Sequence, residues 1–246
     1  MNMAVEEAIA RNVGKRAVSN TIRFWENANT VVIGSYQDAN AEADLEQCAK
    51  YHVDVVRRFT GGGAVYQDEG NLNFAIALFQ DCRLVNKDLL DTFRILSKGV
   101  VLGLRILGMD DAKWERQNCI LTKNLKISGL AGCVRWGTFF CHGSMLVSSD
   151  LSFMNHILGH KEPSDPRFVR SLTKPVTTIS HEVGRQVPLS EVKAALQTGF
   201  QKVFEIKLIR GELTSEELRS ASQLLKEKYS RREWNLGNPW EQRAMV

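Results

Sequence analysis

The sequence lacks the cysteine spacings that build disulfide frameworks. Its 5 cysteines form an odd set without a Cys-x-x-Cys pair, so we expect reduced thiols in a cytoplasmic protein. It also lacks any apolar run of the roughly 18 residues that a membrane-spanning helix needs. Residues 1–7 are acidic where a signal peptide is basic. We therefore expect neither export nor membrane insertion.

A strong charge of one sign is absent as well. The 32 Lys and Arg residues nearly balance the 28 Asp and Glu residues, and the formal net charge is +4. Basic residues are dispersed, with one dense pair at Arg231 and Arg232. This distribution excludes a dedicated nucleic-acid binder but suits a negatively charged substrate or partner. Internal repeats and low-complexity segments are missing too, so the period of the hydrophobic pattern is the main structural signal.

Short apolar runs rich in β-branched and aromatic residues dominate residues 21–147, and such runs are typical of strands. Two of them meet at Gly137 and Thr138 and predict a tight hairpin, in which the glycine takes a positive φ. The predicted strands cover residues 21–25, 30–34, 53–58, 72–78, 119–121, 130–136 and 138–147.

Helical periodicity interrupts and then replaces these runs. Apolar residues at three- and four-residue spacing between Asp88 and Gly108 predict a long core-facing helix with these two residues as its caps. A second helix is expected after Asn40, with Leu45 and Ala49 buried. Three more are expected: over residues 150–159, after a cap at Ser190, and after a capping box formed by Thr214 and Glu217.

Strands followed by helices, with hairpins in place of regular βαβ alternation, predict an α+β fold in which helices pack on a mixed, largely antiparallel sheet. We expect residues 1–182 to form a catalytic core and residues 183–246 a helical C-terminal extension of the same domain.

The most informative segment is the loop from Arg57 to Tyr66, which contains the consecutive glycines Gly61, Gly62 and Gly63. Successive backbone N–H groups of such a loop can surround a phosphate, because no Cβ blocks the approach. The spacing fits neither a P-loop nor a dinucleotide fingerprint. A glycine-rich hairpin turn with solvated arginines stays open as the alternative. Because neighbouring strand residues point to opposite faces, one arginine faces a ligand and the other faces solvent or a structural carboxylate.

Two further segments carry chemistry-bearing side chains. Lys126 lies between apolar neighbours, where an ammonium is costly to bury unless an anion binds it, although an edge-strand lysine in solvent fits as well. By alternation Lys126 shares a face with Ser128, and Cys141 points away from His142, which argues against a Cys-His pair of these neighbours. His142 is either a site residue or a core histidine. We find no metal-ligand cluster. His156 and His160 are four residues apart, but a helix is expected to end between them.

Together these segments resemble the lipoate-protein ligase A family. The similarity continues through residues 167–178 and ends at residues 228–235, so it covers nearly the whole chain. It is carried by four motifs in order: Arg-Arg-x-Thr-Gly-Gly-Gly-Ala-Val-Tyr at 57–66, Asp-x-Gly-Asn at 68–71, Lys-Ile-x-Gly-x-Ala at 126–131 and His-Gly-Ser-x-Leu at 142–146.

The resemblance implies the catalytic fold of biotin-protein ligases and class II aminoacyl-tRNA synthetases, and a two-step reaction with ATP and Mg²⁺. Lipoate would form lipoyl-AMP, and a lysine of an acceptor would then take the lipoyl group. The implied acceptors are lipoyl domains of 2-oxoacid dehydrogenase E2 components or the glycine-cleavage H protein. The resemblance implies Lys126 as the catalytic residue. It implies a substrate and adenylate site formed by Arg58, Gly61, Gly62, Gly63, Ala64, Val65, Tyr66, Asn73, Lys126, Ala131 and His142.

The chain departs from the family pattern at two positions, where Gln67 replaces a frequent His and Cys119 replaces an Asp. Loss of that carboxylate would shift a metal to Asp68 or to phosphate oxygens alone. The family's small C-terminal accessory domain is expected to be absent and supplied by a separate protein, because only a short tail follows residue 237.

Two rival functions remain open at this point. An ATP-independent lipoyl or octanoyl transferase shares the implied fold and lysine, and would carry the acyl group on a cysteine such as Cys119. A binding module that has lost catalysis is the second rival. The sequence does not separate lipoate from octanoate, because both tails need only an apolar slot.

Overall fold

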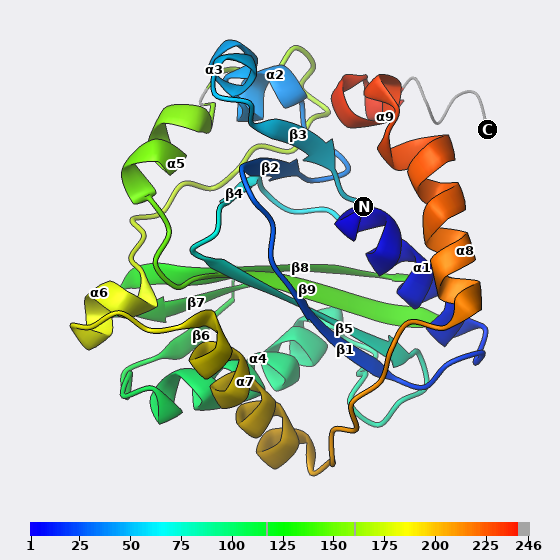
Figure 1. Cartoon of the computed structure of the whole chain (residues 1–246), viewed down its shortest axis with the longest axis vertical. Coiled ribbons are helices and arrows are strands. Elements are labelled where there is room, and N and C mark those ends of the chain that lie inside the picture. Colours follow the sequence, from blue (N-terminus) through cyan, green and yellow to red (C-terminus); the bar gives the residue numbers. More distant parts are fainter. Residues whose placement is uncertain (117, 160, 241–246) are drawn as a thin grey trace.

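The protein is described from a computed structural model that covers residues 1–116, 118–159 and 161–240. A six-stranded sheet crosses the middle of the molecule (Figure 1). All of its neighbouring strands are antiparallel. In spatial order the strands are β1 (Thr21–Trp25), β5 (Asn71–Phe79), β9 (Thr138–Leu146), β8 (Leu125–Arg135), β7 (Cys119–Thr122) and β6 (Lys113–Glu115).

A second, three-stranded sheet lies above the large one in Figure 1. Its central strand β2 (Thr30–Ile33) pairs in parallel with β3 (Asp54–Arg57) and antiparallel with β4 (Val65–Gln67). The parallel pair is connected through α2 (Ala39–Glu42) and α3 (Leu45–Lys50). These helices and α5 (Leu151–Ile157) cover the outer side of the small sheet around an apolar cluster that includes Val31, Cys48 and Ile157. The predicted α+β fold with a mixed, largely antiparallel arrangement is thereby confirmed.

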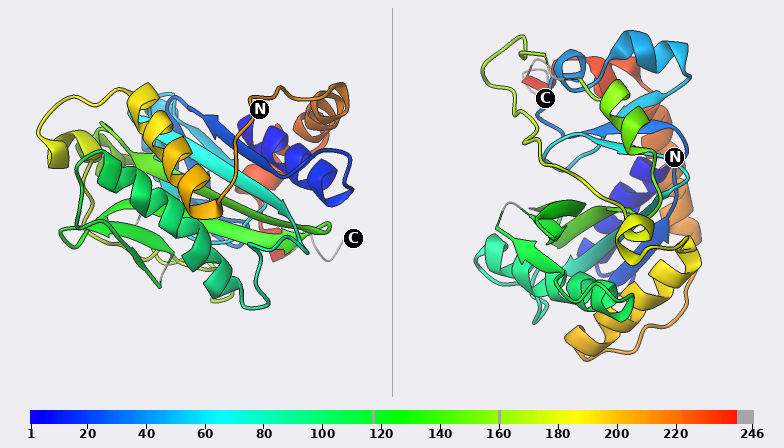
Figure 2. Two further views of the ribbon diagram at one scale, coloured as in Figure 1. Left: turned by 90° about the horizontal axis from the view of Figure 1, so that it is seen from below. Right: turned by 90° about the vertical axis from the view of Figure 1, so that its left-hand side faces the viewer.

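The main hydrophobic core lies between the large sheet and two helices below it, α4 (Leu89–Ile106) and α7 (Leu189–Phe204) (Figure 2). The apolar stripe predicted for the long helix is buried, with Leu96, Val100 and Leu104 fully inaccessible. Its predicted caps are confirmed, because Asp88 accepts the N–H of Leu90 and Gly108 follows the helix at a φ of 92°.

The predicted start of α7 was wrong. Pro188, and not Ser190, occupies the N-cap position, and no side chain caps this helix end. The φ of −64° at Pro188 is the value that its ring imposes, and the helix begins directly behind it. The helix expected after Asn40 is present as α3, and Leu45 packs against the apolar cluster as expected, but the predicted burial of Ala49 was wrong. The short helix α2 precedes it, and α3 buries Cys48 while Ala49 is exposed.

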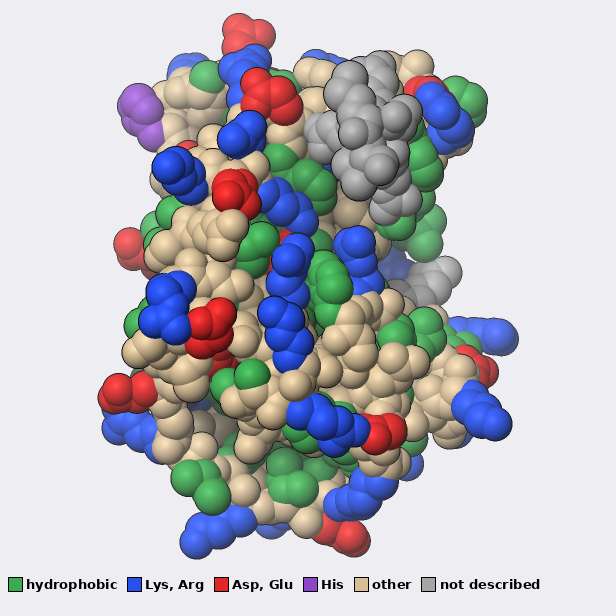
Figure 3. Space-filling model, turned by 90° about the vertical axis from the view of Figure 1, so that its right-hand side faces the viewer, with side chains coloured by type: hydrophobic (Ala, Val, Ile, Leu, Met, Phe, Trp, Pro, Cys, Tyr) green, Lys and Arg blue, Asp and Glu red, His purple; other side chains and the backbone are tan. Residues whose placement is uncertain are grey.

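The helix α1 (Asn2–Gly14) covers the other face of the large sheet. α8 (Ser215–Leu224) packs on α1 and continues into the π-helical turn η1 (Leu225–Tyr229), whereas α9 (Arg232–Leu236) packs on β3 of the small sheet. Thr214 and Glu217 form the predicted capping box of α8. Lys and Arg side chains gather in a band on this side of the molecule (Figure 3). The guanidinium groups of Arg11 and Arg135 each lie 4.8 Å from the ring centroid of Trp136.

The β8–β9 hairpin is confirmed and is longer than expected, because β8 begins at Leu125. Its turn residues Trp136 and Gly137 both have positive φ, 55° and 80°, as a tight two-residue turn requires. The remaining helix, α6 (Ile179–Val183), follows a long loop. In the part of the chain that the structure describes, no helix is long and apolar enough to cross a membrane.

Candidate active site

Two adjoining cavities open between the large and the small sheet. The first, about 260 Å³, is lined by Val32 and the glycine loop on one side and by Ala131 and His142 on the other. The second, about 220 Å³, extends past Tyr66, Met154 and Val176. Their shared wall consists of Ala64, Val65, Lys126, Gly129, Ser144, Ser171, Leu172 and Lys174. The two cavities therefore meet at Lys126 and the end of the glycine loop.

The glycine loop connects β3 to β4 and is held from inside by Arg58. Its guanidinium group donates to the carbonyls of Gly61 and Gly63 at 2.7 Å each and to that of Val32 at 3.1 Å. Burial lowers the pKa of Arg58 to about 10, and the negative charges of Glu6 and Glu42 act in the opposite direction. Gly62 has a φ of 88°, a conformation that costs residues with a Cβ. A buried cation and one left-handed glycine thus shape this loop.

The neighbouring Arg57 corrects one expectation. It was predicted to face solvent or a structural carboxylate, but its side chain is fully buried and donates to four backbone carbonyls, those of Gly34, Gln37, Trp234 and Gly237. These carbonyls come from two distant segments, so Arg57 fastens the C-terminal helix α9 to the small sheet. The two arginines do point to different surroundings, as strand alternation predicted.

The loop after residue 160 closes over the glycine loop at Ser171. The Oγ of Ser171 accepts the N–H of Ala64 at 2.7 Å and one N–H of Gln37 at 3.0 Å, and it donates to Glu42. Its backbone N–H also donates to Glu42, at 2.9 Å. One backbone N–H of the glycine loop, that of Ala64, therefore already donates to the hydroxyl of Ser171.

Lys126 comes from β8, near the centre of the wall that the two cavities share. Its backbone pairs with the segment after residue 170, donating to the carbonyl of Pro175 at 2.8 Å and accepting from the N–H of Thr177 at 3.0 Å. Within the described part of the chain, Nζ of Lys126 forms no ion pair. Burial lowers the pKa of Lys126. Cys119 acts to raise this pKa, whereas the nearby cations Lys174 and Arg58 lower it further. An anion in the cavity would offset this cost.

The predicted shared face of Lys126 and Ser128 was wrong. Opposite β7, the register shifts so that Ile120 pairs with Ser128 and Leu121 with Lys126, which leaves Ile127 as the extra residue of a β-bulge. On its other side Ser128 pairs with Met145 of the main core. The residue beside the lysine side chain is Gly129.

Lys174 and Glu115 add an ion pair to the same wall. Cys119 is buried and its Sγ donates to Oε2 of Glu115 at 3.3 Å. Burial raises the pKa of the Cys119 thiol, and Glu115 adds to the rise, while Lys174 and Lys126 counteract it. Cys141 lies in the main core behind the sheet, so its predicted position on the face away from His142 is confirmed. Burial also raises the pKa of Cys133, to about 11.

His142 projects from β9 into the first cavity and is fixed at both ring nitrogens. Nε2 lies 2.7 Å from Oγ1 of Thr60, and Nδ1 lies 2.9 Å from Oε2 of Glu6 on α1. Glu6 and Thr60 are fully buried. Sequence reasoning missed both residues, because nothing near Glu6 in the sequence shows that this carboxylate of α1 is buried against a histidine 136 residues away.

The predicted site residues do not all line the cavities. Arg58, Gly62, Gly63, Ala64, Val65, Lys126, Ala131 and His142 line the first, and Tyr66 lines the second. Gly61 acts through its carbonyl, which binds Arg58. Asn73 lies behind the first cavity and accepts a hydrogen bond of 2.7 Å from Gln67, which does line it. Sequence reasoning missed Ser171 and Lys174, which lie on the long loop before α6, and Glu115, which lies at the end of β6.

No metal site is built by protein side chains in residues 1–116, 118–159 and 161–240, where no group of three His, Cys, Asp or Glu residues could hold an ion. His160, which was considered with His156, lies outside the described residues. Both carboxylate oxygens of Asp68 accept backbone N–H groups, from Gly70 at 2.9 Å and from Asp150 at 2.8 Å. Asp68 therefore organises a turn.

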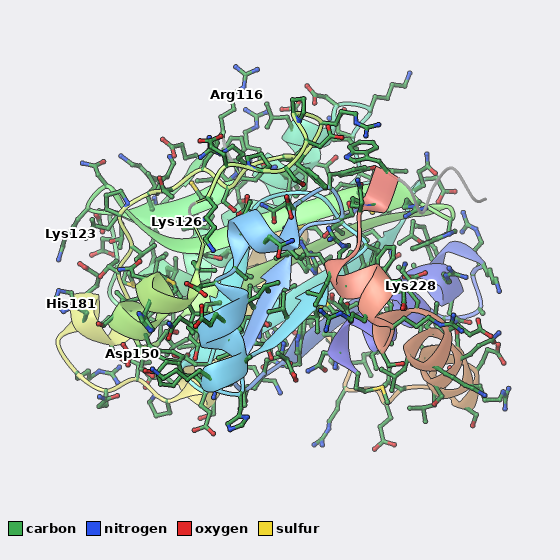
Figure 4. The ribbon with its side chains drawn as sticks, turned by 90° about the horizontal axis from the view of Figure 1, so that it is seen from above. Arg116, Lys123, Lys126, Asp150, His181 and Lys228 are labelled. Atoms are coloured by element: carbon green, nitrogen blue, oxygen red, sulfur yellow. The ribbon has the colours of Figure 1, made fainter. Side chains whose placement is uncertain are left out.

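Figure 4 shows where Lys126 and Lys228 lie on the fold. Lys126 lies on β8 toward one end of the sheets, whereas Lys228 lies beside α9 at the other end. Lys228 pairs with Glu7 at 2.7 Å, and Tyr229 donates to the same carboxylate. Burial opposes ionisation of Glu7, but Lys228 and Tyr229 outweigh it and lower the pKa of Glu7. The C-terminal motif at residues 228–235 is thus a structural fastening to α1.

Residues 1–201 match the family model described as the lipoyl protein ligase A/B catalytic domain. The chain belongs to this family and is an enzyme of the lipoate-protein ligase type. It is 34% identical over 251 residues to lipoate-protein ligase A subunit 1 of Thermoplasma acidophilum, with 96% of this chain and 92% of the relative covered. It is also 29% identical over 256 residues to the octanoyltransferase LipM of Clostridioides difficile, with 96% and 93% covered.

Solved structures agree with this assignment. A putative lipoate protein ligase from Thermoplasma acidophilum with bound lipoic acid superposes with a TM-score of 0.81 at 32% identity, covering 96% of this chain and 93% of that one. A bi-partite lipoate protein ligase of the same organism, studied with its E2 lipoyl domain, gives 0.81 at 31% identity, with 96% and 91% covered. A lipoate-protein ligase A bound with ATP gives 0.80 at 33% identity, with 96% and 92% covered.

Proposed function

We propose that this chain is the catalytic subunit of an ATP-dependent lipoate-protein ligase. The observation that carries the proposal is the position of Lys126, a desolvated cation without a carboxylate partner in the described residues, where two cavities meet beside a loop of backbone donors. In an acyl-adenylate, one phosphate joins the acyl group to the nucleoside. With the acyl group in one cavity and the nucleoside in the other, this negatively charged phosphate would lie at the junction. The similarity to enzymes solved with lipoic acid and with ATP supports both ligands.

The chemistry proceeds in two displacements. A carboxylate oxygen of lipoate attacks the α-phosphorus of ATP, the bond to the β-phosphate oxygen breaks, and pyrophosphate leaves. The amine of an acceptor lysine then attacks the acyl carbon of lipoyl-AMP, and AMP leaves with the electron pair of the broken carbon–oxygen bond. In both steps charge develops on oxygens beside the junction. Lys126 and the N–H groups of the glycine loop stabilise that charge by preorganised electrostatics.

We assign the first cavity to the acyl tail and the second to the nucleoside. Met3, Trp25 and Val32 give the first an apolar end, which fits an alkyl chain with or without a dithiolane. Tyr66, Met154 and Val176 give the second a flat apolar lining that suits a base. Phosphate oxygens would hold Mg²⁺, since the described side chains offer no carboxylate cluster for it. When bound, Mg²⁺ neutralises phosphate charge.

We also propose a separate accessory subunit, and lipoyl domains or a glycine-cleavage H protein as acceptors. The bi-partite ligase of Thermoplasma acidophilum and its E2 lipoyl domain support this arrangement.

An octanoyl transferase that works without ATP is the second candidate. Relatives named octanoyltransferase LipM match over nearly the whole chain, and the Cys119 thiol lines the first cavity together with Lys126. In that reaction Cys119 would displace the carrier thiol from an octanoyl thioester, and the acceptor lysine would then displace Cys119. We favour the ligase because burial and Glu115 raise the pKa of this thiol and so hold it protonated.

The test is an intact-mass assay on apo acceptor domains. The purified chain is incubated with lipoate, ATP and Mg²⁺, with and without an accessory subunit, and in parallel with octanoyl-carrier protein without ATP. An ATP-dependent gain of one lipoyl group supports the ligase, and a gain that needs the second subunit supports the bi-partite form. ATP-independent octanoylation that Cys119→Ser abolishes would reverse the assignment.

A further inference from the structure

Four buried side chains link the N-terminal helix to the glycine loop. Arg58 donates from Nε to Oγ1 of Thr60 at 3.1 Å, Thr60 contacts Nε2 of His142 at 2.7 Å, and Nδ1 of His142 contacts Glu6 at 2.9 Å. All four residues are less than 8% exposed. The chain of contacts spans from residue 6 to residue 142, so it exists only in the folded protein.

The donor and the acceptor of each hydrogen bond among these four side chains can be assigned, starting from Arg58. A guanidinium can only donate, so Oγ1 of Thr60 accepts from Arg58. The hydroxyl proton of Thr60 needs an acceptor, and the described residues offer it Nε2 of His142. Nε2 is then unprotonated, the ring is neutral, and its proton lies on Nδ1, from which it is donated to the carboxylate of Glu6.

Glu6 is placed to enforce this tautomer. An ionised carboxylate accepts hydrogen bonds and donates none, so it selects the ring form that carries its proton on Nδ1. The negative charge of Glu6 raises the pKa values of Arg23 and Arg58 against the lowering caused by burial. A buried carboxylate without such partners would be costly.

We propose that Glu6 is a positioning residue for the glycine loop. By fixing the tautomer of His142, it orients the hydroxyl of Thr60 and, through it, the guanidinium of Arg58. Arg58 in turn holds the carbonyls of Gly61 and Gly63. Because each peptide unit is planar, the direction of these carbonyls sets the direction of the N–H groups that follow them in the loop. The N–H that follows the Gly63 carbonyl, that of Ala64, donates to Oγ of Ser171. That the N–H of Gly62 holds a nucleotide phosphate rests on the proposed function, whereas the tautomer does not.

The first measurement uses the unaltered protein. Two-dimensional ¹H–¹⁵N spectra of the histidine rings report which nitrogen carries the proton, and His142→Gln identifies the signal among those of the 5 histidines. We expect a neutral His142 ring with its proton on Nδ1. A ring protonated on Nε2, or on both nitrogens, at neutral pH overturns the proposal whatever the enzyme's activity.

The second measurement compares Glu6→Gln with Glu7→Gln. Both residues are fully buried carboxylates on α1, but Glu7 pairs with Lys228, Tyr229 and Arg11 and does not contact His142. A glutamine at position 6 can donate or accept, so it no longer selects one tautomer.

We expect Glu6→Gln to shift the His142 tautomer and to weaken ATP binding, measured by calorimetry, roughly tenfold, the loss expected for one hydrogen bond to a charged group. Glu7→Gln is expected to lower the melting temperature while keeping the tautomer and the ATP affinity. Equal ATP affinity in both variants, or an unchanged tautomer in Glu6→Gln, overturns the proposal. If the unaltered chain binds no ATP, the proposed function fails and the tautomer measurement still decides the role of Glu6.

Discussion

A Cβ atom on Gly129 would lie 3.2 Å from Nζ and 3.1 Å from Cε of Lys126. The ammonium group of Lys126 thus folds back over a residue of its own strand, across the bulge at Ile127. A Cβ at position 129 would make a tight contact with the end of this side chain, which would then have to shift by a few tenths of an ångström.

Gly129→Ala is therefore expected to push the end of Lys126 away from the junction of the two cavities. The contacts require a shift of a few tenths of an ångström; because a displacement of about 1 Å can lower a rate roughly 100-fold, we expect a loss of several-fold. Pyrophosphate release measures the adenylation step. Gly211→Ala is the matched control, since a Cβ there meets no atom within 4 Å. Equal rates for the two variants would contradict this packing role.

Lys126→Met should lower the reaction rate while it raises the stability of the protein. Removing a preorganised charge that stabilises a transition state costs roughly 100-fold or more in rate, whereas replacing a desolvated ammonium by an apolar side chain should raise the free energy of unfolding by about 1 kcal/mol. Urea unfolding and pyrophosphate release report the two effects. Lys123→Met, at an exposed residue of the adjoining turn (Figure 4), should leave the rate unchanged. A destabilised Lys126→Met variant would show that the cation is paired in solution.

The lowered pKa of Lys126 also predicts a dependence on pH. Between that pKa and the ordinary value of 10.5, the unfolded chain binds more protons at this residue than the folded chain, so the contribution of Lys126 to the unfolding free energy rises with pH. The stability difference between Lys126→Met and the unaltered chain should therefore shrink as the pH rises through this window. Denaturant unfolding over that window tests the sign, and a growing difference would refute it.

Binding of an anion should act on the same group in the opposite direction. A bound phosphate favours the charged ammonium, so binding raises its pKa and takes up a proton when the pH lies near or above the lowered value. Calorimetry of ATP binding in buffers with different ionisation enthalpies counts this proton. Proton release on binding would contradict the predicted direction.

Arg57→Lys is expected to destabilise the protein without entering the chemistry. The guanidinium of Arg57 serves four carbonyls at once, and an ammonium has only three donors in a different geometry. We expect a loss of about 3 kcal/mol in unfolding free energy. Arg232→Lys, at an exposed residue of α9, is the control and should stay within roughly 0.5 kcal/mol of the unaltered chain.

Local patterns predicted much of this fold. Hydrophobic spacing identified α4, cap residues identified its ends and the start of α8, and a turn glycine identified the β8–β9 hairpin, because each depends on residues within a few positions of one another. Two local predictions failed. Pro188, and not Ser190, precedes α7, and pairing with β7 produces a bulge at Ile127 that breaks the alternation of side chains along β8.

The sequence by itself determined the family, the glycine loop and Lys126 as a candidate, since motif order and residue chemistry are written along the chain. Only the tertiary structure decided which groups surround them. Glu6 reaches His142, Ser171 reaches Ala64, and Arg57 reaches Trp234 across separations of more than 100 residues. Such partners are selected by the cost of leaving buried charges and backbone donors unpaired, and that cost arises only once packing has removed water from the site.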